Sequence, residues 1–117
     1  MSVSEIAHRL IALLREKKFI EAQIELYHED IISIEPEKHP FPKTVGKNKL
    51  IEKERKFLQS IAEWHEFEVS EPLVAKNHFS LRMLTRISLM EGETLEIDEI
   101  ILYEVEHNKI ISEKYFY

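Results

Sequence analysis

Three glutamates occupy positions at which the surrounding pattern does not favour a charge. Glu35 closes a short run rich in isoleucine and precedes Pro36, which stops a strand. From residue 95 to residue 105 every second position is apolar or aromatic except Glu99, and Glu113 alternates with two tyrosines near the end of the chain. A carboxylate on an apolar face must be paired, hydrogen-bonded, protonated or open to a wet cavity. All three are therefore candidates for proton transfer or for holding a polar group of a ligand.

The sequence leaves the role of each glutamate open. For Glu35, a strand-end carboxylate that accepts backbone hydrogen bonds fits as well as one that faces a pocket. For Glu99, a buried acid tied to Arg82, Arg86 or a tyrosine fits as well as a ligand contact. For Glu113 the simpler interpretation is a solvated side chain, because glutamate usually faces water.

An acid/base mechanism needs an ionised carboxylate to take a proton next to a carbonyl and a neutral donor to hold the enolate oxygen. Glu35 could be the first group, and Tyr103 or a protonated Glu99 the second. The chain has two glycines, no glycine-rich phosphate loop, no dinucleotide fingerprint and no Ser-His-Asp order. We therefore expect no cofactor.

The sequence predicts three helices that position these groups. Ser2 and Glu5 have the spacing of a capping box. Apolar residues then recur at helical spacing in three successive segments. The predicted helices end near Lys18, near Leu26 and near Trp64.

The rest of the chain predicts sheet, because apolar and polar residues alternate. Hairpin turns at residues 91–93 and 107–109 join the last three strands into a meander. A loop over residues 37–47 carries two prolines and a glycine. The predicted strands are Ile31–Glu35, His65–Ser70, Phe79–Met90, Leu95–Val105 and Ile110–Tyr117. We expect one α+β domain over residues 1–117, with three N-terminal helices packed into a strongly curved antiparallel sheet.

Composition excludes several classes of protein. A net charge of −6 argues against a nucleic-acid surface. The basic residues between Lys43 and Lys56 are read as a solvated helix face, together with Glu52 and Glu54. No apolar run approaches a membrane span, no signal peptide is visible, and the chain has no cysteine, so we expect a cytoplasmic protein.

The six histidines show no spacing that would place two metal ligands on one face of a helix or strand, so we expect no metal site. His65 follows Trp64 and alternates with Phe67 and Val69. A core histidine is therefore the favoured interpretation of this residue.

Four sequence features resemble one family. They are Leu26-Tyr27-x-Glu29-Asp30-x-x-x-x-Glu35-Pro36, Gly46 before the third helix, the run from Tyr103 to Ile110, and the closing Tyr115-Phe116-Tyr117. With the order of helices and strands, they resemble the SnoaL-like branch of the nuclear transport factor 2-like superfamily. The resemblance covers nearly the whole chain and implies a cone-shaped α+β barrel.

The resemblance also implies roles for individual residues. Glu35 matches the position that holds the general base in ketosteroid isomerases, and Glu113 is expected to line the cone. The isomerase pattern requires a tyrosine on the first helix, but residues 10–14 are all apolar. Its second oxyanion acid falls near Ile101, so the steroid-isomerase set is incomplete.

The leading functional hypothesis is a domain that binds a small, largely apolar molecule inside the cone. The alternatives are a cofactor-independent isomerase, cyclase or hydratase that uses Glu35, and a protein-interaction module. Candidate catalytic residues are Glu35 and Glu99. Candidate ligand-binding residues are Tyr27, Ile31, Ser33, Trp64, Phe67, Met83, Ile101, Tyr103, Glu113, Tyr115 and Tyr117. A homodimer is expected, because several outward sheet positions are apolar, namely Ile32, Ile34, Ile100, Leu102 and Phe116.

Overall fold

The computed structural model describes all residues from 1 to 117 and contains three helices and seven strands. The helices are α1 (Val3–Arg15), α2 (Phe19–Leu26) and α3 (Lys47–Gln59). The strands are β1 (Tyr27–Ile34), β2 (Lys43–Val45), β3 (Ile61–Val69), β4 (Leu73–Val74), β5 (His78–Leu89), β6 (Thr94–Glu106) and β7 (Lys109–Phe116). No helix is long and apolar enough to span a membrane.

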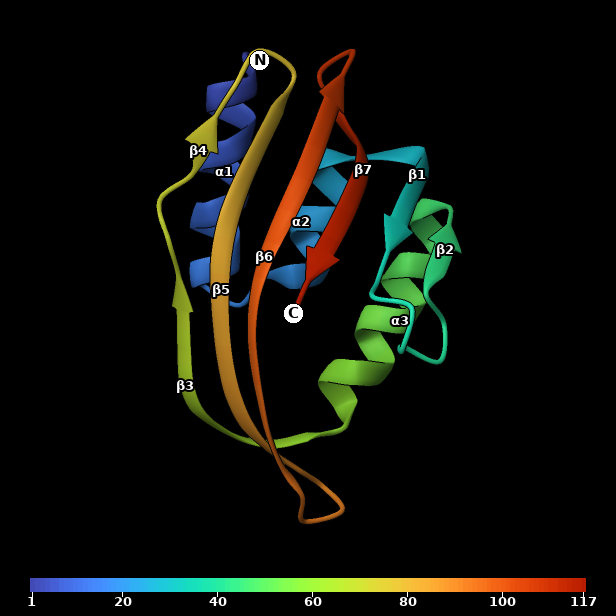
Figure 1. Ribbon diagram of the computed structural model, residues 1–117, viewed down its shortest axis with the longest axis vertical. Coiled ribbons are helices and arrows are strands. Elements are labelled where there is room, and N and C mark those ends of the chain that lie inside the picture. The colour runs from blue at the N-terminus through green and yellow to red at the C-terminus, as the bar shows by residue number, and fades with distance from the viewer.

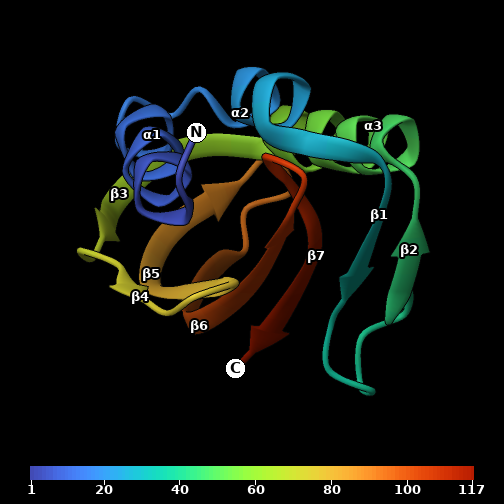
Figure 2. The ribbon, with the colours of Figure 1, turned by 90° about the horizontal axis from the view of Figure 1, so that it is seen from above.

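The strands form one curved sheet in the order β2-β1-β7-β6-β5-β3, and β4 pairs with the N-terminal end of β5. The helices cover the concave side of this sheet (Figures 1 and 2). The predicted α+β architecture is therefore confirmed. The expectation of a wholly antiparallel sheet is wrong in one respect, because β1 pairs with β7 in parallel. The sheet is also not closed, since β2 and β3 form its two edges.

Helix α1 begins where the capping box predicts. The Ser2 hydroxyl accepts a hydrogen bond from the Glu5 backbone, and the Glu5 carboxylate accepts one from the Ser2 backbone. The helix ends at Arg15, three residues before the predicted end, because Lys17 adopts a φ of 59°. The Lys18 amide then donates to the Leu13 carbonyl, which completes a typical C-terminal cap.

The predicted end of the third helix near Trp64 is wrong, because α3 ends at Gln59 and Trp64 lies in β3. The register of β3 shifts twice, between Ile61 and Glu63 and between Trp64 and Glu66. Each shift adds a residue on one strand, so inward side chains recur every three residues. A spacing of three residues between inward side chains is also typical of a helix, and the sequence therefore predicted a longer third helix.

The same irregularity changes the environment of His65. Trp64 and Phe67 both pack towards the core, whereas His65 is exposed and bonds the Ser88 hydroxyl. The expectation that His65 is a core histidine is wrong, because strict alternation does not hold across a bulge.

The first strand begins earlier than predicted, because Tyr27 pairs with Ile110 of β7. It ends at Ile34, so Glu35 lies one residue beyond the strand, where its backbone amide donates to the Pro42 carbonyl at 2.8 Å. The predicted loop contains the short strand β2, which pairs Thr44 with Ser33.

The core fills the space between α1, α2 and the concave face of the sheet. Its fully buried side chains include Ile6, Leu10, Ile31, Phe79, Ile101 and Ile110. Leu58, Trp64, Phe67, Met83 and Tyr115 pack against this core but remain partly exposed. The concave face is therefore fully covered at one end and less covered at the other.

Candidate functional site

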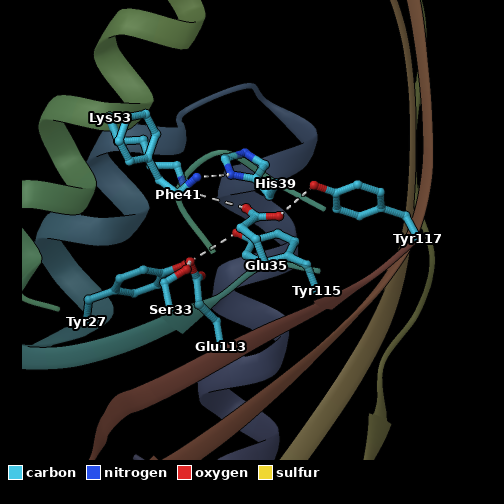
Figure 3. A network of polar contacts seen from close by, with 9 residues as sticks. All are labelled: Tyr27, Ser33, Glu35, His39, Phe41, Lys53, Glu113, Tyr115 and Tyr117. Carbon is cyan, nitrogen blue, oxygen red and sulfur yellow. Dashed lines mark hydrogen bonds and ion pairs between the residues drawn. The ribbon is translucent and has the colours of Figure 1, made fainter. Parts of the chain in front are cut away.

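Glu113 of β7 lies at the centre of a buried hydrogen-bond network (Figure 3). Its carboxylate accepts hydrogen bonds from the hydroxyls of Tyr27, of Ser33 at 2.7 Å and of Tyr115 at 3.1 Å. The residue is 2% exposed. Burial raises the pKa of Glu113, and the three hydroxyl donors partly oppose that rise.

The interpretation of Glu113 as a solvated side chain is therefore wrong. The cause is the parallel pairing of β1 with β7, which places Ser33 directly opposite Glu113. Tyr27 begins the same strand β1 and supplies the second hydroxyl. The family resemblance implied that Glu113 lines the cone, but the alternation in β7 gave no information about which strand would cover it.

Glu35 has two side-chain partners. The Tyr117 hydroxyl donates to its carboxylate at 2.9 Å, and the Lys53 ammonium lies 3.6 Å away (Figure 3). The Glu35 side chain is 13% exposed. Its carboxylate bonds the side chains of Lys53 on α3 and of Tyr117, the residue after β7, and the strand-end interpretation with backbone donors does not describe it.

Glu99 is the least satisfied of the buried acids. It is 7% exposed, and its carboxyl group has no hydrogen bond or ion pair with any residue. The two arginines expected as partners lie on the other face, where Arg82 bonds Asp98 at 2.8 Å and Arg86 pairs with Glu66. The expectation of a pairing with either arginine is therefore wrong.

Burial is the main cause of a raised pKa of Glu99, which reaches about 8. The carboxylates of Glu35, Glu113 and Glu54 raise the pKa further, because repulsion disfavours another negative charge. Glu99 thus keeps its proton to a pH at which an exposed glutamate is fully ionised.

Glu54 of α3 completes the group and was missed in the sequence, where it was read as part of a solvated face. It is half-buried, and burial followed by repulsion from Glu113 raises its pKa to about 7. The sequence does carry a signal. Leu50 and Leu58 stand four residues before and after Glu54, so the glutamate lies in the apolar stripe of the helix.

The tyrosines around these acids are hydrogen-bond donors. Burial is the main cause that raises the pKa of Tyr27, Tyr103 and Tyr115 well above the usual value, so their hydroxyls stay protonated. Tyr103 lies opposite Glu113 in the register of β6 and β7, and its ring stacks on Phe79 with centroids 4.7 Å apart.

The other predicted site residues fall into two groups. Ile31 and Ile101 belong to the sealed core and present no surface to solvent. Trp64 and Phe67 meet edge to face at 5.4 Å, and Met83 lies opposite Glu99 in the register of β5 and β6. The last three side chains are partly exposed on the concave face, and Met83 is the one that lies beside an acid.

Two hollows lie away from the four acids. One, of about 400 Å³, is formed by the N-terminal residues and the turn between β6 and β7. The other, of about 510 Å³, lies near Arg15 and includes Phe67 among its lining residues. No three acidic or histidine side chains are grouped so that they could hold one metal ion.

Comparison with known proteins places this architecture. The family model of the SnoaL-like domain matches residues 1–117. No curated protein sequence matches the chain. A solved structure from Mesorhizobium loti is 30% identical, with 100% of both chains covered and a TM-score of 0.89. That protein is provisionally named a SnoaL-like polyketide cyclase and also a carbohydrate phosphatase.

More distant structures share the fold. A nuclear transport factor 2-like protein of unknown function from Burkholderia pseudomallei is 13% identical, with 100% of this chain and 92% of that chain covered and a TM-score of 0.78. A protein of ketosteroid isomerase-like fold from Catenulispora acidiphila, in complex with trimethylamine, is 12% identical, with 100% and 87% covered and a TM-score of 0.74.

Proposed function

Because this chain belongs to the SnoaL-like domain family of the nuclear transport factor 2-like superfamily, we propose that it binds a small, largely apolar molecule on the concave side of its sheet. One observation carries the proposal. Trp64, Phe67, Met83 and Tyr115 remain partly exposed on the concave side, next to an acid that has no partner in the protein. Apolar walls with a few convergent polar groups are typical of ligand sites. The fold likeness to a protein solved with trimethylamine is consistent with this class of ligand.

The single tryptophan of the chain provides the test. A ligand that covers the concave face should change the fluorescence of Trp64, which stacks on Phe19 at 5.8 Å between ring centroids. We expect a saturable change with neutral apolar probes. Met83→Glu, which adds a charge to the proposed wall, should abolish it, whereas Leu73→Glu on the exposed strand β4 should not. A linear, unsaturable response in the unmodified protein would contradict the proposal.

A second candidate function is proton-transfer catalysis without a cofactor. It is favoured by the contrast between Glu99, with a pKa raised to about 8, and Glu35, whose carboxylate is held by Lys53 and Tyr117. The Glu35 carboxylate could remove a proton from a substrate. A neutral Glu99 on the same face could then stabilise the enolate with a hydrogen bond. Glu35→Gln should abolish turnover of any substrate found, and unchanged turnover would exclude this role.

We also propose that two copies pair through the convex face of the sheet. Ile32, Ile100, Leu102 and Phe116 are exposed there, as the sequence predicts, and Ile34 is half-buried. Exposed apolar side chains on one face of a sheet favour association with an identical face. A cytoplasmic location stays a prediction from the cysteine-free sequence.

A further inference from the structure

The concave face has more carboxyl groups than cations to neutralise them. Glu35, Glu54, Glu99 and Glu113 come from four different parts of the chain, and each of the three with a raised pKa is affected by at least one of the others. The only ion pair in this group joins Glu35 to Lys53 at 3.6 Å. The concave face is therefore a region of negative potential whenever these acids ionise.

Four of the five hydroxyls around these acids already donate to a carboxylate, and only that of Tyr103 does not. Tyr27, Ser33 and Tyr115 all donate to Glu113, and Tyr117 donates to Glu35. A ligand rich in acceptor oxygens would find few donors that are not engaged. A ligand that donates hydrogen bonds would find carboxyl oxygens ready to accept them.

Glu99 is the acid of this group that has no partner. The residue is 7% exposed, and its carboxyl group has neither a hydrogen bond nor an ion pair. Glu99 shares the inner face of β6 with Ile101 and Tyr103. The residue after it, Ile100, pairs with Phe116 of β7. Its side chain therefore points into the group of acids and lies beside the strand end that carries Tyr117.

We propose that the polar group held on the concave face is an organic cation, a protonated amine that donates a hydrogen bond to the carboxylate of Glu99. This inference rests on the proposed function and specifies its ligand class. The apolar part of the amine would lie on Met83, Phe67 and Trp64, and the ring of Tyr115 would offer its face to the charge. The Tyr117 ring is already 5.5 Å from the Lys38 ammonium. A metal ion fits less well, because no three acids are grouped to hold one.

Proton release distinguishes this ligand from a neutral one. Glu99 and Glu54, with pKa values of about 8 and about 7, are partly protonated near neutral pH. A bound cation favours their ionised forms, so amine binding should release protons and tighten as the pH rises. A carbonyl ligand that accepts a hydrogen bond from neutral Glu99 should instead weaken as the pH rises. The titratable and charged groups around Glu99 are Glu35, Glu54, Asp98, Tyr103, Glu113, Tyr115 and Tyr117, with Lys53 paired to Glu35.

The experiment compares phenylbutylamine with phenylbutanol of the same length, using Trp64 fluorescence and calorimetry. We expect the amine to bind about tenfold more tightly than the alcohol near pH 8, with affinity for the amine rising from about pH 6 to about pH 8. Glu99→Gln should remove this preference, so that the amine binds no more tightly than the alcohol. Glu96→Gln, the same change at an exposed position of β6, is the matched control.

The outcomes separate the two proposals. Equal affinity for the amine and the alcohol, or a preference that survives Glu99→Gln, would overturn the cation inference while small-molecule binding stands. Amine affinity that falls with rising pH would overturn it as well. If neither probe binds while neutral apolar dyes still saturate the protein, only the cation inference fails. If dyes also fail to saturate it, the proposed function fails.

Discussion

The Ser33 hydroxyl donates a 2.7 Å hydrogen bond to the carboxylate of Glu113, across a separation of 80 positions in the chain. The parallel register of β1 and β7 sets this contact, because it places the two residues side by side. Tyr27, which pairs with Ile110 at the start of β1 before the register shifts, donates to the other oxygen of Glu113. Glu113 is therefore a buried acid with three donors, whereas Glu99 is a buried acid with none.

Replacing Ser33 with alanine should destabilise the protein. The variant leaves Glu113 buried with one fewer donor, which typically costs about 1 to 3 kcal/mol. Chemical denaturation at neutral pH measures this loss. Ser112→Ala is the control, because the Ser112 hydroxyl makes only a 3.5 Å contact with Glu104. An equal loss in both variants would mean that the bond to Glu113 contributes nothing specific.

The stability of the protein should fall as the pH rises through the neutral range. The folded-state pKa of Glu99, about 8, lies above the ordinary value of 4.5, so the folded state binds more protons between these values. The stabilisation is present below about pH 4.5 and is lost as the pH rises to about 8, at about 1.4 kcal/mol per pH unit for one proton. Denaturation curves across this range measure the slope.

Glu99→Gln should flatten that pH dependence and stabilise the protein near pH 8, because glutamine cannot ionise. Near pH 4, where Glu99 is neutral in both states, the variant and the unmodified protein should have similar stability. The exposed-face variant Glu96→Gln should retain the original slope. A Glu99→Gln variant with an unchanged slope would show that another group is responsible.

Glu54→Leu should also stabilise the protein at alkaline pH. The change restores the apolar stripe of α3 between Leu50 and Leu58 and removes a half-buried charge, with a gain on the order of 1 kcal/mol at about pH 8. Thermal unfolding measures the gain. Glu52→Leu on the same helix replaces an exposed residue that pairs only with Lys56, and it should give no gain. If Glu54→Leu unfolds more easily, the glutamate has a stabilising partner in solution.

The dimer proposal predicts that a charge on the convex face separates two copies. Ile100 is 53% exposed in the single chain, so Ile100→Lys should leave folding intact and convert a dimer to a monomer in sedimentation. Leu73→Lys is the control, because Leu73 is exposed on β4, outside the proposed face. An unmodified protein that sediments as a monomer at micromolar concentration would exclude the dimer.

Local patterns in the sequence predicted most of the elements and the faces of their residues. The capping box at Ser2 and Glu5, the positive φ of Gly92 and Asn108 in the two hairpins, and the inward side chain of Glu99 all follow from short-range rules. They could be predicted because helix and strand periodicity depends only on the geometry of neighbouring residues.

Tertiary structure decided what each inward residue meets. Glu113 gained two hydroxyl partners, Tyr27 and Ser33, from the parallel pairing of β1 with β7 and a third from Tyr115 of its own strand, whereas Glu99 gained none. The bulges of β3 turned Trp64 inward and His65 outward against simple alternation. Pairing partners and bulges depend on residues far apart in the chain, so alternation predicted the inward side chain of Glu99, and only the fold decided that Glu113 is buried, that Glu54 joins the group and that Glu99 has no partner.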